Sequence, residues 1–202
     1  METITITLGI LSAFMHITAF WLYSRQMILG TSRPKAATWL LWPLLTVLNC
    51  LVYLLSTGDW VKAMMPICSS IACLVIVVIA IKRKNLDWPR LWELMVMMAA
   101  VDVAILYFAF KSGMAANLLM QGCIAISFIP TIVGVVSNPR SERPLPWFIW
   151  AVGYSLTLIV VLIRWKNQPS DLVYPINCLI LHAVVGALTY RTAKTNCERR
   201  TA

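Results

Sequence analysis

Ten polar side chains lie deep inside long apolar stretches, and they are the residues of this sequence that could do chemistry. They are His16, Asn49, Asp102, Asn117, Gln121, Ser127, Tyr154, Thr157, Asn177 and His182. Amide, hydroxyl and imidazole groups bind a polar solute by hydrogen bonds, and imidazole or carboxyl groups can also carry protons. The same groups serve equally well as hydrogen bonds between packed helices, so both uses stay open for each residue.

The sequence has no arrangement typical of an enzyme or a metal site. The HExxH and GxSxG patterns are absent, and so are paired carboxylates. The six cysteines lack paired metal spacing, and five of them lie in apolar segments, where cysteine behaves as a small hydrophobic residue. We therefore expect no enzymatic activity, no metal and no cofactor.

The apolar composition indicates that lipid, rather than water, surrounds most of the chain. Of 202 residues, 60% are hydrophobic and 12% are charged, whereas a soluble domain usually has about 25% charged residues. Seven apolar stretches approach the roughly 20 residues that a membrane-spanning helix needs. They are Ile4–Tyr23, Ala37–Ser56, Ala63–Ile81, Leu91–Phe110, Met114–Val136, Trp147–Ile163 and Leu172–Tyr190. We predict an all-α integral membrane protein with seven transmembrane helices, in which the first stretch is retained because no basic residue precedes it.

The basic residues orient these seven helices in the membrane. Lys62, Lys111, Arg164 and Lys166 fall on one side, and the other thirteen of the 17 lysines and arginines fall on the opposite side. Cytoplasmic loops carry the excess of basic residues, so the N-terminus is predicted outside and the C-terminus inside. The net charge of +9 follows from this pattern, and we expect no nucleic-acid binding.

Tryptophans gather near the predicted membrane interfaces. Trp39, Trp42, Trp147 and Trp150 fall near the cytoplasmic side of their stretches. Tryptophan is enriched at membrane–water interfaces, where its ring sits among the lipid headgroups. We interpret these residues as members of an interfacial belt rather than as ligand contacts.

An internal repeat relates the two halves of the sequence. Three features recur in the same order and at nearly the same spacing, namely Arg33-Pro34 as Arg143-Pro144, Trp39-x-x-Trp42 as Trp147-x-x-Trp150, and Pro66-Ile67 as Pro175-Ile176. Three helices invert the chain, so a second copy in the same orientation needs one extra crossing. We divide the chain into a first three-helix repeat (1–84), a linker helix (85–112), a second three-helix repeat (113–194) and a basic cytoplasmic tail (195–202).

Local motifs make this arrangement, with three helices, a linker helix and three more helices, similar to that of a known family. The second stretch ends in Leu51-Val52-Tyr53-Leu54-Leu55, a Gly58-Asp59 turn follows, and Ile129-Pro130-Thr131 is similar to a decayed Pro-Gln pair. The chain resembles the SWEET and PQ-loop superfamily, whose nearest unit is the bacterial semiSWEET half. The resemblance implies parallel repeats with a solute site between them, near the middle of the membrane.

The repeat and the polar residues together predict a site. The substrate-binding residues are predicted to be Asn49, Ser69, Tyr154, Thr157 and Asn177. The ionisable residues that could form a proton or polar relay are His16, Asp102 and His182. Proline within a helix frees a backbone carbonyl and permits bending, and we expect hinges at Pro43 and Pro130.

The predicted function is transport of a small polar solute by alternating access, through a facilitator or an ion-coupled carrier. The alternative is a membrane receptor or interaction protein on the same seven-helix fold, and a channel also stays open. The expected partners are the lipid bilayer and the solute, and the oligomeric state, including a homo-oligomer, is undecided. Short loops and a compact bundle favour a multi-pass protein of the bacterial inner membrane.

Overall fold

Seven helices form the chain in the computed structural model, which describes the backbone of residues 1–84, 86–109 and 113–201. They are α1 (Glu2–Ile28), α2 (Ala36–Thr57), α3 (Trp60–Lys82), α4 (Leu91–Ala109), α5 (Gly113–Ser137), α6 (Pro144–Ile163) and α7 (Ser170–Thr201). Each predicted stretch lies within one of these helices, except that Phe110, the predicted end of the fourth, and Lys111 fall outside the described residues. The all-α prediction with seven helices is confirmed, and the described residues form no strand.

Several helices have the length and apolarity of membrane spans. Among the described residues these are Glu2–Ile28, Trp60–Lys82, Asn117–Ser137, Pro144–Ile163 and Ser170–Arg191. Large apolar side chains also cover the outside of the bundle, as at Phe14, Ile71 and Met98, which are each more than 60% exposed. A surface of this kind is suited to lipid rather than to water, and these helices indicate a multi-pass membrane protein.

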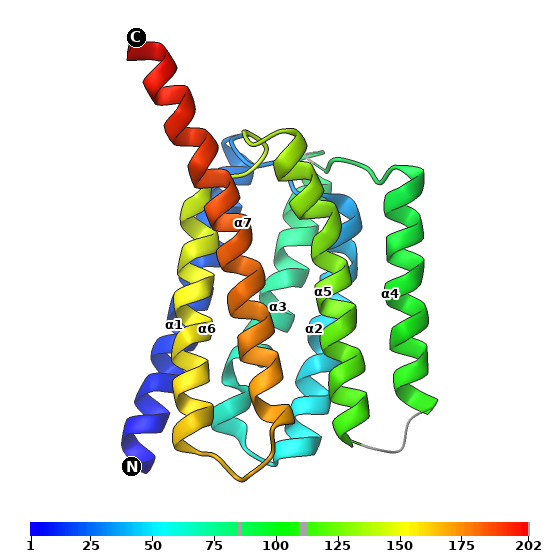
Figure 1. Ribbon diagram of the computed structural model, residues 1–202, viewed down its shortest axis with the longest axis vertical. Helices are drawn as coiled ribbons and strands as arrows, with labels where there is room; N and C mark the ends of the chain where they lie inside the picture. Colours follow the sequence, from blue (N-terminus) through cyan, green and yellow to red (C-terminus); the bar gives the residue numbers. More distant parts are fainter. Residues whose placement is uncertain (85, 110–112, 202) are drawn as a thin grey trace.

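The helices run roughly side by side, which gives the bundle two distinct ends (Figure 1). We call the end with the N-terminus and the α2–α3 and α6–α7 connections the N end. The opposite end, with the α1–α2, α3–α4 and α5–α6 connections, is the C end. Helix α7 continues beyond the bundle at the C end as far as Thr201, so the backbone of residues 195–201, which were assigned to a tail, is helical.

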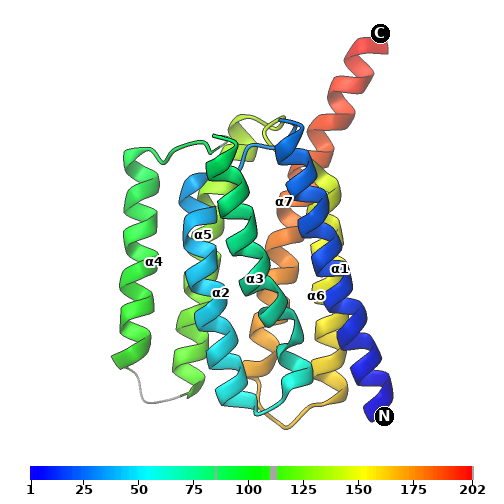
Figure 2. The ribbon, with the colours of Figure 1, turned by 180° about the vertical axis from the view of Figure 1, so that it is seen from behind.

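Helix packing repeats between the two halves of the chain. Helix α1 packs against α3 and α6, while α5 packs against α7 and α2. Helix α3 also packs against α2, as α7 does against α6. We call α1–α3 the first unit and α5–α7 the second unit; each packing contact described above for one has a counterpart in the other. Helix α4 packs on α5 and stands at the edge of the bundle, as the two opposite views in Figures 1 and 2 show.

Short polar segments connect the helices and hold the ends together. Gly58 ends α2 with a positive φ of 60°, which favours glycine, and the Asp59 side chain caps α3 by accepting a hydrogen bond from the Val61 amide at 3.1 Å. At the C end, the Arg33 amide donates to the Ser141 carbonyl oxygen at 2.8 Å. This last bond ties the α1–α2 connection to the α5–α6 connection, and therefore joins the two units.

Candidate functional site

Side chains from six helices surround a cavity between the two units. The lining residues are His16, Phe20, Trp42, Leu45, Thr46, Asn49, Pro66, Ser69, Cys73, Ile124, Phe128, Trp150, Tyr154, Tyr174, Cys178 and His182. The cavity leaves about 40 Å³ for the centres of water molecules, which is room for a few waters or one small ring. Among the described residues, no aspartate, glutamate, lysine or arginine lines it, and no residue of α4 does.

The lining includes residues at equivalent places in the two units. Ser69 and Cys178 each follow the proline of the repeated Pro-Ile pair by three residues, and both line the cavity. Thr46 and Tyr154 each follow the second tryptophan of their unit by four residues, and both also line the cavity. The cavity therefore lies where the two units present corresponding positions to each other.

His16 is fully enclosed and holds one side of the cavity. Its Nε2 lies 2.6 Å from the Ser69 hydroxyl oxygen, and that hydroxyl lies 2.9 Å from the Met65 carbonyl oxygen. A serine hydroxyl has one hydrogen. When Ser69 donates it to Met65, His16 Nε2 is the donor to Ser69 and Nδ1 is left as an acceptor. No hydrogen-bond partner meets that buried Nδ1 atom.

His182 holds the opposite side of the same cavity. Its Nδ1 lies 2.7 Å from the Cys178 carbonyl oxygen, so this nitrogen is the donor and Nε2 is the acceptor of the neutral ring. The Tyr154 ring contacts both histidines, with its centroid 5.4 Å from that of His16 and 5.0 Å from that of His182. Imidazoles from both units thus meet one tyrosine in the cavity wall.

Four tryptophans close the cavity towards the C end. Trp39 and Trp42 from the first unit have ring centroids 4.7 Å apart, and Trp147 and Trp150 from the second are 5.2 Å apart. Between the two units, the ring centroids of Trp39 and Trp150 are 6.3 Å apart, and those of Trp42 and Trp147 are also 6.3 Å apart. All four side chains are buried. The belt interpretation of these residues is therefore wrong: the tryptophan quartet packs on itself in the core and does not face lipid.

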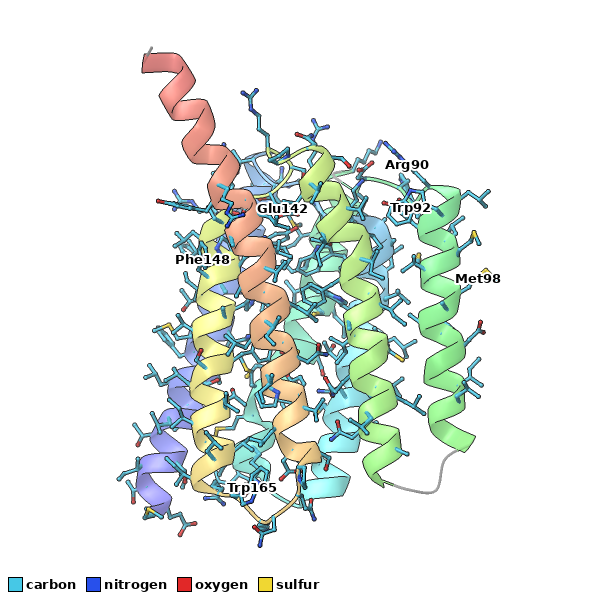
Figure 3. All side chains as sticks on the ribbon, in the orientation of Figure 1. Arg90, Trp92, Met98, Glu142, Phe148 and Trp165 are labelled. Carbon is cyan, nitrogen blue, oxygen red and sulfur yellow. The ribbon has the colours of Figure 1, made fainter. Side chains whose placement is uncertain are left out.

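A buried carboxyl group lies beyond the tryptophan quartet. Glu142 belongs to the α5–α6 connection and lies among the side chains of the C end (Figure 3). The Tyr23 hydroxyl donates to its Oε1 at 2.6 Å. Burial raises the pKa of Glu142 to about 8, although the hydrogen bond from Tyr23 acts in the opposite direction. No pattern in the sequence marks this residue, because it sits in a short charged loop without periodicity.

Two ion pairs join the units at the N end. Lys62 Nζ of α3 lies 2.7 Å from Asp171 Oδ2 of α7, and both side chains are almost completely buried. Arg164 Nε, just after α6, lies 2.7 Å from Oδ2 of Asp59. Burial raises the pKa of Asp59, but the hydrogen bond and charge of Arg164 outweigh it and hold that pKa below its usual value. The N end is therefore closed by charge, and the C end by aromatic rings.

Three of the five predicted substrate-binding residues line the cavity, namely Asn49, Ser69 and Tyr154. Thr157 lies outside the lining, where its hydroxyl is 2.7 Å from that of Ser12. Asn177 also lies outside, and its side-chain amide donates to the Gln121 carbonyl oxygen at 2.9 Å. Both residues connect helices instead, which is the other use that the sequence left open.

A chain of amide side chains extends from the cavity wall. Gln121 Nε2 donates to Asn49 Oδ1 at 2.9 Å, and the Asn117 side chain donates to the Ser170 carbonyl oxygen at 3.3 Å. With Asn177, these contacts link α2, α5 and the start of α7. The oxygen of Asn49 is thus engaged within the protein, although its side chain reaches the cavity.

The remaining predicted residues divide between the cavity and the surface. His16 and His182 line the cavity, whereas the Asp102 side chain is exposed on α4. Pro43 lies within α2 and Pro130 within α5, and neither is among the described lining residues. Their role as hinges stays a prediction.

No protein-family model, curated protein or solved structure matches this chain.

Proposed function

We propose that this chain is a seven-span membrane carrier that moves a small polar solute by alternating access. The observation that carries the proposal is the cavity between the two units, closed at one end by the tryptophan quartet and at the other by two ion pairs. A carrier needs a site that two separate closures isolate from the two sides of the membrane. The cavity with both ends shut corresponds to the occluded state of such a cycle.

The membrane orientation rests on the charges at the two ends. Basic residues at the C end include Arg33, Arg83, Arg140 and Arg191. The positive-inside rule places this end in the cytoplasm and the N-terminus outside, with all seven helices crossing the membrane. The short connections are consistent with a bacterial inner-membrane protein.

Repeated helix packing supports two parallel three-helix units with α4 as the linker. The paired contacts of α1 and α5, and the corresponding residues on the two sides of the cavity, support a two-fold axis along the membrane normal as part of this proposal. This architecture is similar to that of the SWEET and PQ-loop superfamily, to which we assign the chain as part of the proposal. The solute site of that architecture lies between the repeats, where the cavity is.

Each closure can open without breaking the other. Opening the N end separates Lys62 from Asp171 and Arg164 from Asp59, which lets water reach the cavity from outside. Opening the C end separates the tryptophans of the two units and exposes Glu142 to the cytoplasm. In both cases the two units rock against each other while the helices of each unit stay packed.

The cavity cysteines allow a test that needs no knowledge of the solute. Cys178 lines the cavity and is buried, so a variant that retains only Cys178 can be exposed to a membrane-impermeant methanethiosulfonate in oriented vesicles. Lys62→Met should raise the reaction rate from outside by about tenfold or more, because it favours the outward-open state. Trp147→Ala should raise the rate from the cytoplasmic side instead.

The control is a variant that retains only Cys123, which is equally buried on α5 but outside the described lining. Its reaction rate should stay low with either substitution. The carrier proposal is wrong if Cys178 never reacts, or reacts only from one side in every variant. Access from one side alone is the behaviour expected of a receptor on the same fold, and simultaneous access from both sides is that of a channel.

A further inference from the structure

The cavity walls restrict the kind of molecule that the cavity can hold. Phe20, Trp42, Phe128, Trp150 and Tyr154 bring aromatic rings from α1, α2, α5 and α6 to the space. No charged side chain stands among the described lining residues. A carboxylate, phosphate or ammonium group placed there would lose its hydration without meeting an opposite charge.

Two unpaired polar atoms belong to side chains of this wall. His16 Nδ1 is a buried acceptor without a partner, and Trp150 Nε1 is a buried donor without one. Their rings are neighbours, with centroids 6.3 Å apart. Buried polar groups are nearly always hydrogen-bonded in native proteins. A ligand that carries both a donor and an acceptor would satisfy these two atoms together.

The small size of the space and its aromatic walls favour a flat molecule. The few waters that fit in the cavity occupy about the volume of one six-membered ring. Aromatic walls bind flat rings by offset stacking or edge-to-face packing. Most hydroxyl groups of a saturated sugar would meet apolar walls, because Asn49 and Ser69 are engaged with Gln121 and His16.

We propose that the cavity binds an uncharged, planar, single-ring heteroaromatic solute with a hydrogen-bond donor and an acceptor on its edge. The inference rests on the proposed function, because it names the class of solute that the carrier moves. Within this class, the ring lies among the aromatic side chains, while its edge donates to His16 Nδ1 and accepts from Trp150 Nε1. The solute carries no charge, so binding adds none to the middle of the membrane.

A matched set of probes tests the charge and shape requirements. Nicotinamide, nicotinate and 1-methylnicotinamide share one ring and differ in charge, and glucose is an uncharged molecule that is not planar. Binding to the full chain in detergent is measured by thermal shift and by calorimetry. We expect nicotinamide to bind about 100-fold more tightly than either charged analogue, because the charge of nicotinate or 1-methylnicotinamide would be buried without a counter-charge. Glucose should give no shift at the same concentration.

One conservative substitution tests the role of the unpaired donor. Trp150→Phe keeps an aromatic ring and removes the indole N–H, and it should weaken nicotinamide binding by about tenfold. Trp88→Phe is the matched control, because Trp88 is exposed at 70% in the α3–α4 connection and should have no effect. Unchanged binding in Trp150→Phe, with a normal melting temperature, would overturn the proposed contact.

The results separate this inference from the carrier proposal. If nicotinate, 1-methylnicotinamide or glucose binds as well as nicotinamide, or if none of the probes binds, the solute class is wrong. Alternating reactivity of Cys178 would still support the carrier in that case. If nicotinamide binds selectively but Cys178 reacts from one side only, the solute class stands and the transport cycle fails.

Discussion

Glu142 places a carboxyl group against Tyr23 at the C end, where burial excludes water. Burial raises its pKa to about 8, whereas an unfolded chain has a glutamate pKa of about 4.3. As the pH rises between these two values, the unfolded state ionises and the folded state resists ionisation. The stability that is present at low pH is therefore lost progressively up to about pH 8.

Replacing Glu142 should remove this dependence. Glu142→Gln keeps an oxygen that can accept from Tyr23 but cannot ionise. We expect the melting temperature of the native protein to fall by several degrees between pH 5.5 and 8, and that of the variant to fall less. Glu2→Gln, which alters an exposed glutamate, is the control and should follow the native protein. If the melting temperatures of the native protein and of Glu142→Gln changed in parallel with pH, the raised pKa of Glu142 would be contradicted.

Lys62 and Asp171 form an ion pair from which water is almost fully excluded, at 0% and 1% side-chain exposure. Each lies four residues before the proline of its helix, so they occupy the same position in the two units. These two positions meet in the ion pair, and two identical charges there would repel. The opposite charges of this pair are what allows the N end to close.

Replacing one partner of this ion pair should lower the free energy of unfolding by more than replacing both partners. Lys62→Met removes the lysine from Asp171 in the closed N end and should destabilise this closed form of the protein by about 3–5 kcal/mol. The double variant Lys62→Met/Asp171→Met should recover most of that loss, because two packed apolar side chains need no counter-charge. Unfolding in detergent measures both. Lys82→Met, at an exposed site, is the control and should leave the free energy of unfolding unchanged. A double variant that is less stable than Lys62→Met would contradict the proposed ion pair.

At the scale of the elements, α6 has a glycine where it passes α1 and the Met65 side chain of α3. The Ser12 hydroxyl donates to the Gly153 carbonyl oxygen at 2.9 Å, and an added Cβ at Gly153 would stand 2.9 Å from Met65 Cε and 3.5 Å from the Ser12 carbonyl oxygen. This close approach lets the first and second units pack beside the cavity.

Enlarging that glycine should weaken the contact between the units. Gly153→Val should lower stability by about 1–3 kcal/mol through overpacking. Gly122 on α5 meets nothing within 4 Å of an added Cβ, so Gly122→Val is the matched control and should unfold like the native protein. Equal behaviour of the two variants in a thermal unfolding experiment would mean that the α1–α6 crossing is not tight at Gly153.

The helices could be predicted from the sequence because apolar stretches and polar turns have a local signal. The turn at Gly58 and Asp59 and all seven helices follow from it. Contacts between distant helices have no such signal, so the burial of the tryptophan quartet was not predicted. Asn177 and Ser69 look alike as polar residues in apolar helices, and only the fold shows that Ser69 reaches the cavity and Asn177 does not. Glu142 gave no sign of burial because its neighbours in the loop are charged.

The whole molecule combines similar units with dissimilar closures. Corresponding positions line the cavity, but the N end is held by ion pairs and the C end by aromatic packing with one carboxyl group. Separating buried charges needs water and ions on one side, whereas separating rings exposes apolar surface. Two closures of different chemistry can be opened by different conditions, so that one opens while the other stays shut, as alternating access requires.

Distances between spin labels at the two ends test alternating access most directly. One pair would replace the exposed residues Trp60 and Lys166 at the N end, and the other Arg83 and Arg140 at the C end, in a cysteine-free background reconstituted in lipid. We expect Lys62→Met to lengthen the N-end distance while the C end stays closed, and Trp147→Ala to do the reverse. Distances that lengthen together at both ends, or that stay fixed in both variants, would contradict it.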